Sequence, residues 1–202
     1  MAAVSFALFG TLVDADLPAD PAAAVGEELR ARGVTLPDDW HEAYHETHVD
    51  APDGAEVPLP AHVSRALVSR GVDAPGNAPR RAVVAAFDPE VRTRTGAVEA
   101  VAAASERGPV GLLVNCAVPE LVGRTLVRSA LSRDDFDAIV TSVACGWRKP
   151  DARAFERVAD ALDVSPEALT HVGSDPAVDG AVRDAGGRYV DASESLPEAW
   201  PP

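Results

Sequence analysis

The chain begins with a short, continuous run of apolar residues. Positions 3–9 read AVSFALF and are followed at once by Gly10 and Thr11. An apolar run of this length that ends in a glycine predicts a buried β-strand and a tight turn. From about residue 18 to residue 91 the pattern changes to helix-sized segments with apolar stripes, each with a proline at or near its start. We expect four helices in this region, at 20–32, 37–49, 60–70 and 78–87.

After Arg94 the chain alternates between short apolar segments and amphipathic ones. The short segments predict strands at 110–115, 136–142, 169–173 and 188–191. The amphipathic segments predict helices at 98–107, 120–131, 151–162 and 177–185. Such alternation over short links is typical of a parallel sheet covered on both faces.

The sequence therefore predicts an α/β protein with a Rossmann-like core. Residues 1–17 and 92–202 form this core, and an all-helical insertion, residues 18–91, interrupts it after the first strand. The last residues, 193–202, read as a tail. Ligands gather at the carboxyl ends of the strands in parallel α/β sheets, so we expect a site there with the inserted helices above it as a lid. The segments at those ends are Ala7–Gly10, Val114–Asn115, Ser142–Lys149 and Gly173–Asp179.

Charge narrows the range of partners. Acidic residues number 32 against 18 basic ones, which gives a net charge of −14 and a sequence pI near 4.6. Such a surface repels nucleic acid phosphates and anionic lipids, so we exclude both as partners. It suits a salt-rich cytoplasm, where salt screens self-repulsion, and is typical of a halophilic source. The sequence shows no signal peptide or membrane span, and we expect a cytoplasmic protein.

Two residue types are scarce. The two cysteines, Cys116 and Cys145, form no disulfide framework, and we expect reduced, largely buried thiols. Lys149 is the only lysine of the chain.

Four segments carry a specific resemblance, and each lies at a predicted strand end. They read FALFGTLVD (Phe6–Asp14), NCAVPEL (Asn115–Leu121), GWRKPDARAFE (Gly146–Glu156) and HVGSDPAVDGAVRDAG (His171–Gly186). In this order they resemble the four motifs of the haloacid dehalogenase-like hydrolase superfamily, and the insertion lies where that family has its helical, C1-type cap. The resemblance covers the whole core. It implies a hydrolase that forms a covalent aspartyl intermediate and, outside the metal-free haloacid dehalogenase branch, uses magnesium.

The chain departs from these motifs at the positions that react. The resemblance places the nucleophilic aspartate at Ala7, the second-motif serine or threonine at Val114, and the magnesium aspartate of the fourth motif at Ser174. A methyl group cannot form the covalent bond, and two carboxylates that normally hold magnesium are missing. Val114 can donate no hydrogen bond to a phosphoryl oxygen.

Other residues of the vestigial site remain, namely Phe9, Asn115, Lys149, Asp175 and Asp179. We therefore expect a catalytically degenerate protein, retained as a small-anion-binding or protein-interaction module. The expected partner is a small phosphorylated or anionic metabolite, or a protein of unknown identity. No cofactor is predicted, and Mg²⁺ is expected only if the site is active.

A residual hydrolase acting on phosphate esters or haloacids is the alternative. The haloacid dehalogenase branch carries serine where this chain has Ser174, which keeps that branch in view. Asp14 and Asp16 resemble a substitute Asp-x-Asp pair, but they lie past the turn. Since productive geometry tolerates only small displacements, we expect both to be solvated loop aspartates.

Lys149 has two interpretations. In the first, its ammonium binds an anion together with Asn115 and the turn residues Gly10 and Thr11, because the loss of two carboxylates makes the pocket less negative. In the second, it forms a half-buried ion pair with Asp175 or Asp179, retained because an unpaired buried charge is costly.

The insertion contains a metal-like pattern. His41, Glu42 and His45 match the HExxH motif of zinc proteases, and His48 follows three residues later. On one helix the three histidines share a face, so they are weak candidates for a metal-binding cap. The metzincin extension is missing, and we expect a solvated helix face instead. His171 carries no site signal and is expected to pack at a strand.

Overall fold

The computed structural model of the chain describes residues 2–196. The strands are β1 (Ala3–Phe6), β2 (Val13–Ala15), β3 (Val91–Thr93), β4 (Val110–Val114), β5 (Ala138–Thr141), β6 (Leu169–Gly173) and β7 (Arg188–Asp191). The α-helices are α1 (Pro21–Arg30), α2 (Trp40–His45), α3 (Leu59–Ser69), α4 (Ala78–Ala86), α5 (Ala97–Ser105), α6 (Leu121–Arg128), α7 (Ser142–Cys145) and α8 (Ala152–Ala161). The 3₁₀ helices are Arg133–Asp135, Pro166–Ala168 and Asp179–Ala185.

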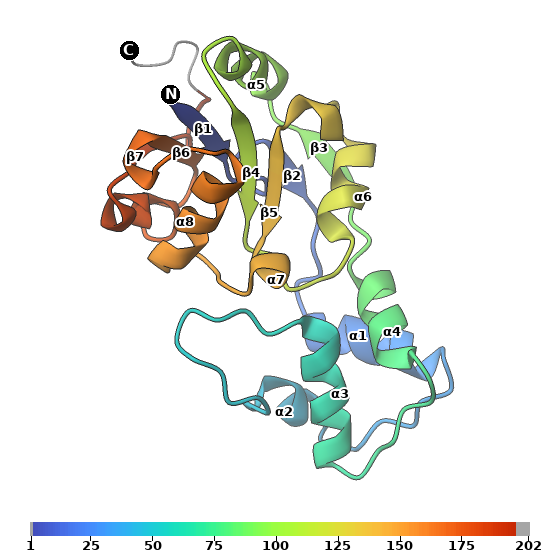
Figure 1. The fold of residues 1–202 in the computed structure, drawn as a ribbon. Helices are drawn as coiled ribbons and strands as arrows, with labels where there is room; N and C mark the ends of the chain where they lie inside the picture. The colour runs from blue at the N-terminus through green and yellow to red at the C-terminus, as the bar shows by residue number, and fades with distance from the viewer. Residues whose placement is uncertain (1, 197–202) are drawn as a thin grey trace.

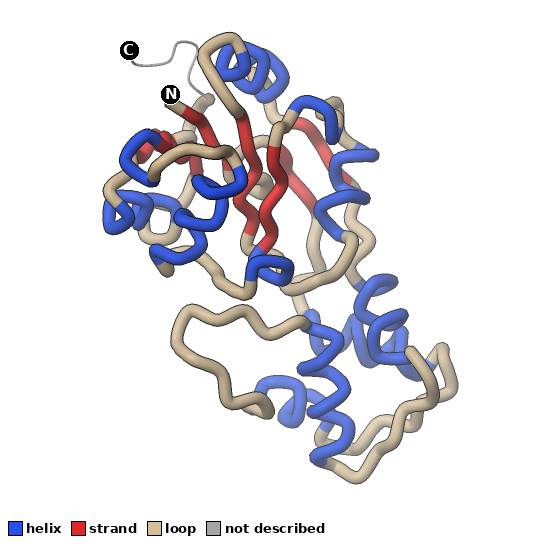
Figure 2. The backbone as a smooth tube through the Cα atoms, in the orientation of Figure 1, coloured by secondary structure: helices blue, strands red, loops and turns tan. Residues whose placement is uncertain are grey.

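A five-stranded sheet forms the centre of the molecule. Its order is β5-β4-β1-β6-β7, and every neighbouring pair is parallel. Helices α5 and α6 pack over one face, while α8 and the 3₁₀ helix Asp179–Ala185 pack over the other, as Figure 2 shows. Both faces are covered, which is why the inner strands have apolar runs and not an alternating pattern. The predicted α/β, Rossmann-like fold is confirmed.

A small ribbon marks the place where the chain leaves and re-enters this core. Strands β2 and β3 pair antiparallel, with Val13 opposite Thr93 and Ala15 opposite Val91. Between them run the four helices α1–α4, which pack against one another around buried residues such as Trp40 and Leu67. In Figure 1 these helices lie beyond the carboxyl ends of β4 and β5. The boundaries at residues 17 and 92, and the role of this helical segment as a cap, stay predictions.

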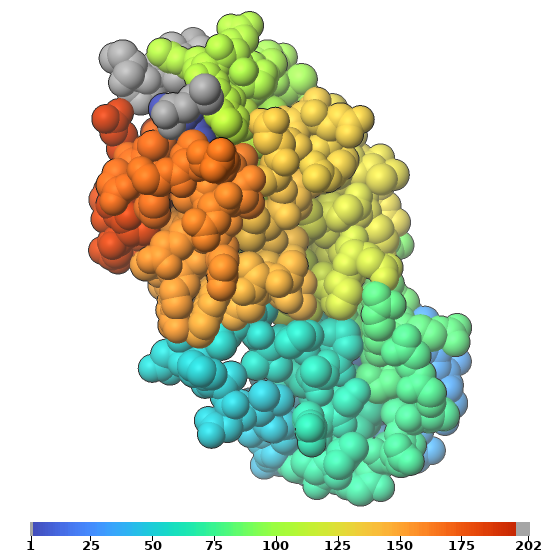
Figure 3. All heavy atoms as spheres, viewed as in Figure 1, coloured from blue at the N-terminus to red at the C-terminus, as the bar shows by residue number. Residues whose placement is uncertain are grey.

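The segment between α2 and α3 connects the helices to the core. Ala55 forms an isolated bridge with Trp147, and the Glu56 carboxylate accepts a 2.6 Å hydrogen bond from the Ser142 hydroxyl. The same hydroxyl accepts a 2.7 Å bond from the backbone N–H of Cys116. Figure 3 shows this segment in cyan against the lower edge of the core. The helical segment is thus held close to the strand ends.

Several local expectations need correction. The predicted helix 37–49 is confined to Trp40–His45, because Glu46 is already extended and β-branched residues and a proline follow. The predicted strand 136–142 is confined to Ala138–Thr141, and α7 begins at Ser142. The predicted helix 177–185 is a 3₁₀ helix over Asp179–Ala185. The ribbon β2/β3 was not predicted, since strands of three residues are too short to show alternation.

In residues 2–196 no helix is long and apolar enough to cross a membrane. Both cysteines are free thiols, with Cys116 buried and Cys145 partly buried.

Candidate functional site

The carboxyl ends of β1, β4 and β6 and the loop before α8 enclose one cavity of about 150 Å³. All eight residues of the expected vestigial site line it, together with Leu8 and Val178: Ala7, Phe9, Val114, Asn115, Lys149, Ser174, Asp175 and Asp179. Their convergence follows from the topology, because β1 lies between β4 and β6 and its end adjoins both neighbours.

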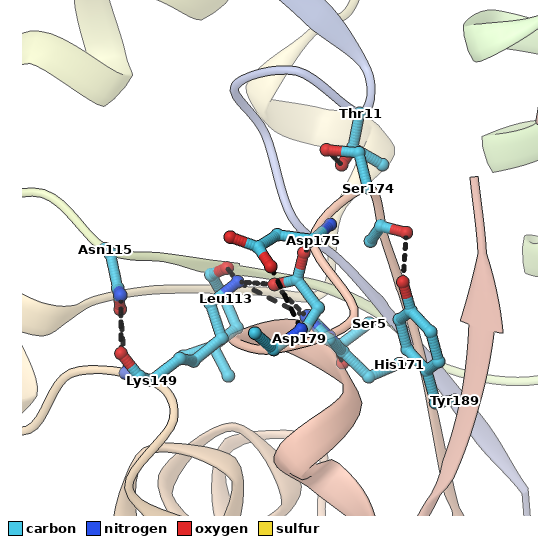
Figure 4. Close-up of polar contacts among 12 residues, drawn as sticks. Ser5, Thr11, Leu113, Asn115, Lys149, His171, Ser174, Asp175, Asp179 and Tyr189 are labelled. Atoms are coloured by element: carbon cyan, nitrogen blue, oxygen red, sulfur yellow. Dashed lines mark hydrogen bonds and ion pairs between the residues drawn. The ribbon is translucent and has the colours of Figure 1, made fainter. Parts of the chain in front are cut away.

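Lys149 forms a buried ion pair in the wall of this cavity. The residue is only 4% exposed, and its Nζ lies 2.6 Å from Asp179 Oδ1 and 3.0 Å from the Leu113 carbonyl oxygen (Figure 4). Burial lowers the pKa of Lys149, and the Asp179 carboxylate opposes that shift. Burial acts to raise the pKa of Asp179, but the hydrogen bond with His171 and the Lys149 charge outweigh it and hold that pKa well below its usual range. The ion-pair interpretation of Lys149 therefore has the geometry in its favour, with Asp179 as the partner.

His171 belongs to the same network, which the sequence did not reveal. Its ring is fully buried; Nδ1 lies 2.7 Å from Ser5 Oγ, and Nε2 lies 3.3 Å from both Lys149 Nζ and Asp179 Oδ1. Burial and the Lys149 ammonium lower the pKa of His171 to about 4, so the imidazole is neutral at neutral pH. It packs at a strand, as expected, and also spans the ion pair. The sequence signal that could have revealed this network is a polar residue within each of two apolar strands, Ser5 in β1 and His171 in β6.

Ser5, His171 and Asp179 stand in the order of a nucleophilic triad. Ser5 is fully buried in the sheet, however, so its hydroxyl cannot reach a substrate. This cluster stabilises the core and offers no replacement nucleophile.

Asn115 positions Lys149 through the backbone. Its Nδ2 donates to the Lys149 carbonyl oxygen and its Oδ1 accepts from the Lys149 N–H, both at 2.8 Å. These two bonds hold the Asn115 side-chain amide against the loop before α8, at the edge of the cavity.

The turn after β1 differs from the expected anion site. The Gly10 N–H donates to the Val13 carbonyl oxygen at 2.8 Å, and the Thr11 N–H donates to the Leu8 carbonyl oxygen at 3.3 Å. The Thr11 hydroxyl donates to Ser174 Oγ at 3.2 Å. The expectation that Gly10 and Thr11 offer free donors is therefore wrong, because the tight turn, with Gly10 at a φ of 73°, uses them internally.

Two backbone N–H groups just before this turn, those of Leu8 and Phe9, have no hydrogen-bond partner among the described residues. Both residues line the cavity. Sequence reasoning missed this pair because backbone groups have no residue-type signal. Two neighbouring N–H groups at a turn form a concave, partly positive surface.

The residues present do not fit a magnesium ion. Magnesium needs several hard oxygen ligands in near-octahedral geometry. Ala7 offers a methyl group, Asp179 is held by Lys149, and one oxygen of Asp175 accepts the Ala177 N–H at 3.0 Å. Within residues 2–196 no group of three His, Cys, Asp or Glu side chains is arranged to hold a metal.

Asp14 and Asp16 lie away from the cavity. Asp14 is exposed in β2, and Asp16 pairs with Arg92 at 3.1 Å, both at the ribbon that precedes the helices. Neither lines the cavity, which agrees with the expectation of solvated aspartates and removes them as substitute nucleophiles.

The three-histidine metal site is also corrected. His41 and His45 lie on α2 with ring centroids 4.5 Å apart, but the helix ends at His45. His48 therefore leaves their face: its Nε2 lies 2.6 Å from the Ala43 carbonyl oxygen, and its ring packs near His62. A metal site of three histidines would require α2 to continue as far as His48.

Comparisons with known proteins support the fold alone. No family model matches the chain, and no curated protein matches it. Among solved structures, a 2-haloacid dehalogenase from Pseudomonas syringae pv. Tomato DC3000 superposes with a TM-score of 0.66 at 18% identity, covering 95% of this chain and 86% of that one. CbbY from Rhodobacter sphaeroides, in complex with phosphate, gives 0.60 at 21% identity, over 98% and 92%. A predicted phosphoglycolate phosphatase from Haemophilus somnus 129pt gives 0.59 at 15% identity, over 99% and 88%.

The order of the sheet and these superpositions define a Rossmann-like α/β fold. The chain has the haloacid dehalogenase-like fold.

Proposed function

We propose that this protein is a pseudoenzyme of the haloacid dehalogenase-like fold, without hydrolase activity, whose residual cavity binds a small anion. The observation that carries the proposal is the methyl group of Ala7 at the carboxyl end of β1, where the resemblance expects the nucleophile. The two acidic residues that line the cavity offer no replacement. Asp179 is bound to Lys149, and Asp175 is exposed beyond β6.

Three features support anion binding. The N–H groups of Leu8 and Phe9 have no hydrogen-bond partner among the described residues, and both residues line the cavity. The carboxylates that would repel an anion at positions 7 and 174 are absent. The cavity of about 150 Å³ has room for an ion of the size of phosphate. CbbY, a structural neighbour, was itself solved in complex with phosphate.

The first experiment tests activity. The purified protein is incubated with phosphate esters and 2-haloacids, with and without magnesium. We expect no turnover above background, because loss of a nucleophile reduces turnover by a factor on the order of a million. Turnover that Lys149→Ala abolishes would instead favour the residual hydrolase.

The second experiment tests binding with inorganic phosphate as the probe. Unfolding is compared in phosphate and in chloride at matched ionic strength, with chelator present, because salt alone stabilises an acidic protein. A specific ligand contributes about 2.7 kcal/mol at a hundredfold excess over its dissociation constant. Ala7→Asp should abolish the phosphate-specific shift by charge repulsion, while the neutral control Ala7→Asn should keep it. Equal shifts in phosphate and chloride for the wild type would refute anion binding.

A further inference from the structure

A second hollow lies on the surface between α6 and the edge strand β5. It measures about 660 Å³ and shares no lining residue with the candidate site. Its wall is mostly apolar, with Val122, Leu126, Leu131, Ile139 and Val143 among the lining residues. In Figure 1, α6 and β5 lie at the side of the sheet opposite β7. Concave, mostly apolar hollows of this volume are typical of binding sites.

The exposed face of α6 has a protruding side chain, Val127, and a glycine without one, Gly123, one helical turn apart. We call them the knob and the hole. Val127 is 88% exposed, the highest exposure among the large apolar residues that the structure describes. Gly123, four residues earlier and therefore on the same face, has only open space where a Cβ would stand. Both residues line the hollow. If two such helices cross in antiparallel orientation, each Val127 meets the Gly123 of the other helix.

The charges of this surface fit the same arrangement. Glu120 and Arg133 are the charged residues that line the hollow, so its lining is neutral on a chain of net charge −14. Glu120 precedes the first residue of α6, whereas Arg133 follows its last turn, so they lie at opposite ends of the hollow. A two-fold axis brings each residue i against residue j of the partner and each j against i. It would therefore place Glu120 of each copy, which pairs with Arg80 in its own chain, near Arg133 of the other copy. Arg133 donates one hydrogen bond to the Phe136 carbonyl oxygen, at 2.8 Å, and its charge still lines the hollow.

We propose that the α6–β5 hollow, defined by Gly123, Val127, Glu120 and Arg133, is the interface of a two-fold homodimer. A second copy is the occupant that this surface fits, because it supplies a matching knob, hole and end charges in one two-fold arrangement. The neutral lining is also where two chains of −14 can approach with least repulsion. The inference is independent of the anion site.

The test is the oligomeric state of the full chain, measured by sedimentation velocity across a wide concentration range. We expect a wild-type dimer whose association strengthens with added salt, because salt screens the repulsion between two acidic chains. Val127→Asp should raise the dimer dissociation constant by about thirtyfold or more, as expected for a central interface residue. Val68→Asp is the matched control, since Val68 is 60% exposed on α3 outside the hollow, and it should leave the dimer intact.

Two further variants test the geometry. Gly123→Leu should block the dimer without affecting the monomer fold, because its side chain enters open space. Arg133→Glu should weaken the dimer, because it would bring a second carboxylate against Glu120 of the other copy. A wild type that stays monomeric at every concentration would overturn the proposal, as would a dimer that both Val127→Asp and Gly123→Leu leave unchanged.

Discussion

Replacing Lys149 by methionine would test whether the retained charges hold the core together. The substitution keeps most of the side-chain bulk and removes the ammonium that lies 2.6 Å from Asp179 Oδ1. The Asp179 carboxylate, whose side chain is 5% exposed, is then left without its cationic partner. Removing one partner of a buried pair costs about 3–5 kcal/mol, so we expect Lys149→Met to be destabilised by this amount at neutral pH.

The loss should depend on pH because of His171. In the wild type its pKa is lowered to about 4, so the folded state resists protonation while the unfolded state accepts it near 6.5. The unfolded state therefore binds more protons between pH 6.5 and 4, so wild-type stability falls as the pH decreases through that window. At about 1.4 kcal/mol per pKa unit, the loss is about 3 kcal/mol. In Lys149→Met the repelling ammonium is gone and Asp179 remains. There the pKa of His171 rises, and its protonation restores a cation beside the carboxylate.

Urea unfolding of both proteins between pH 8 and pH 4 provides the assay. The difference in unfolding free energy between wild type and Lys149→Met should be largest near pH 8 and shrink towards pH 4. Arg92→Met is the control, because the Arg92–Asp16 pair is exposed, and its removal should change stability little at any pH. A difference that is constant with pH, or that grows in acid, would refute the assignment of His171 to this network.

Two other predictions concern the same region. The triple variant Ala7→Asp, Val114→Thr, Ser174→Asp should bind magnesium in calorimetry, whereas each single variant should not, because groups that act as a unit are strongly non-additive; no heat from the triple variant would mean that the surrounding backbone cannot hold the ion. Ser142→Ala should lower the unfolding free energy by about 1–3 kcal/mol, because the buried N–H of Cys116 loses its acceptor; unchanged stability would show that the link to Glu56 is dispensable.

Much of the fold could be predicted because buried parallel strands have a strong sequence signal. The predicted strands 169–173 and 188–191 coincide with β6 and β7, and 110–115 exceeds β4 by one residue. The length of α2 and the ribbon β2/β3 could not be predicted, since both depend on the packing of the chain where it enters and leaves the helical segment. Propensity in three-residue strands is too weak to outweigh that context.

The site was predictable only where residue types carry a signal. The motif segments placed eight side chains at strand ends, and all eight line one cavity. The buried network around Lys149 depends on contacts between distant parts of the chain. The contact between Ser5 and His171 is another example, and no local sequence pattern predicts such contacts. The free donors of Leu8 and Phe9 depend on how the turn closes, which sends the N–H groups of Gly10 and Thr11 inward instead.

On the proposal that the site has lost its reactive groups, the geometry also accounts for how the fold persists. Asn115, Lys149 and Asp179 each make two or more hydrogen bonds to other elements. Removing any one of them leaves a buried polar group or charge without a partner, at a cost of kilocalories. A carboxylate at position 7 would instead project into the cavity, where solvent or a ligand completes its contacts. Under that proposal, Ala7 lines the cavity while the retained residues hold the core, so stability constrains the retained residues more strongly than position 7.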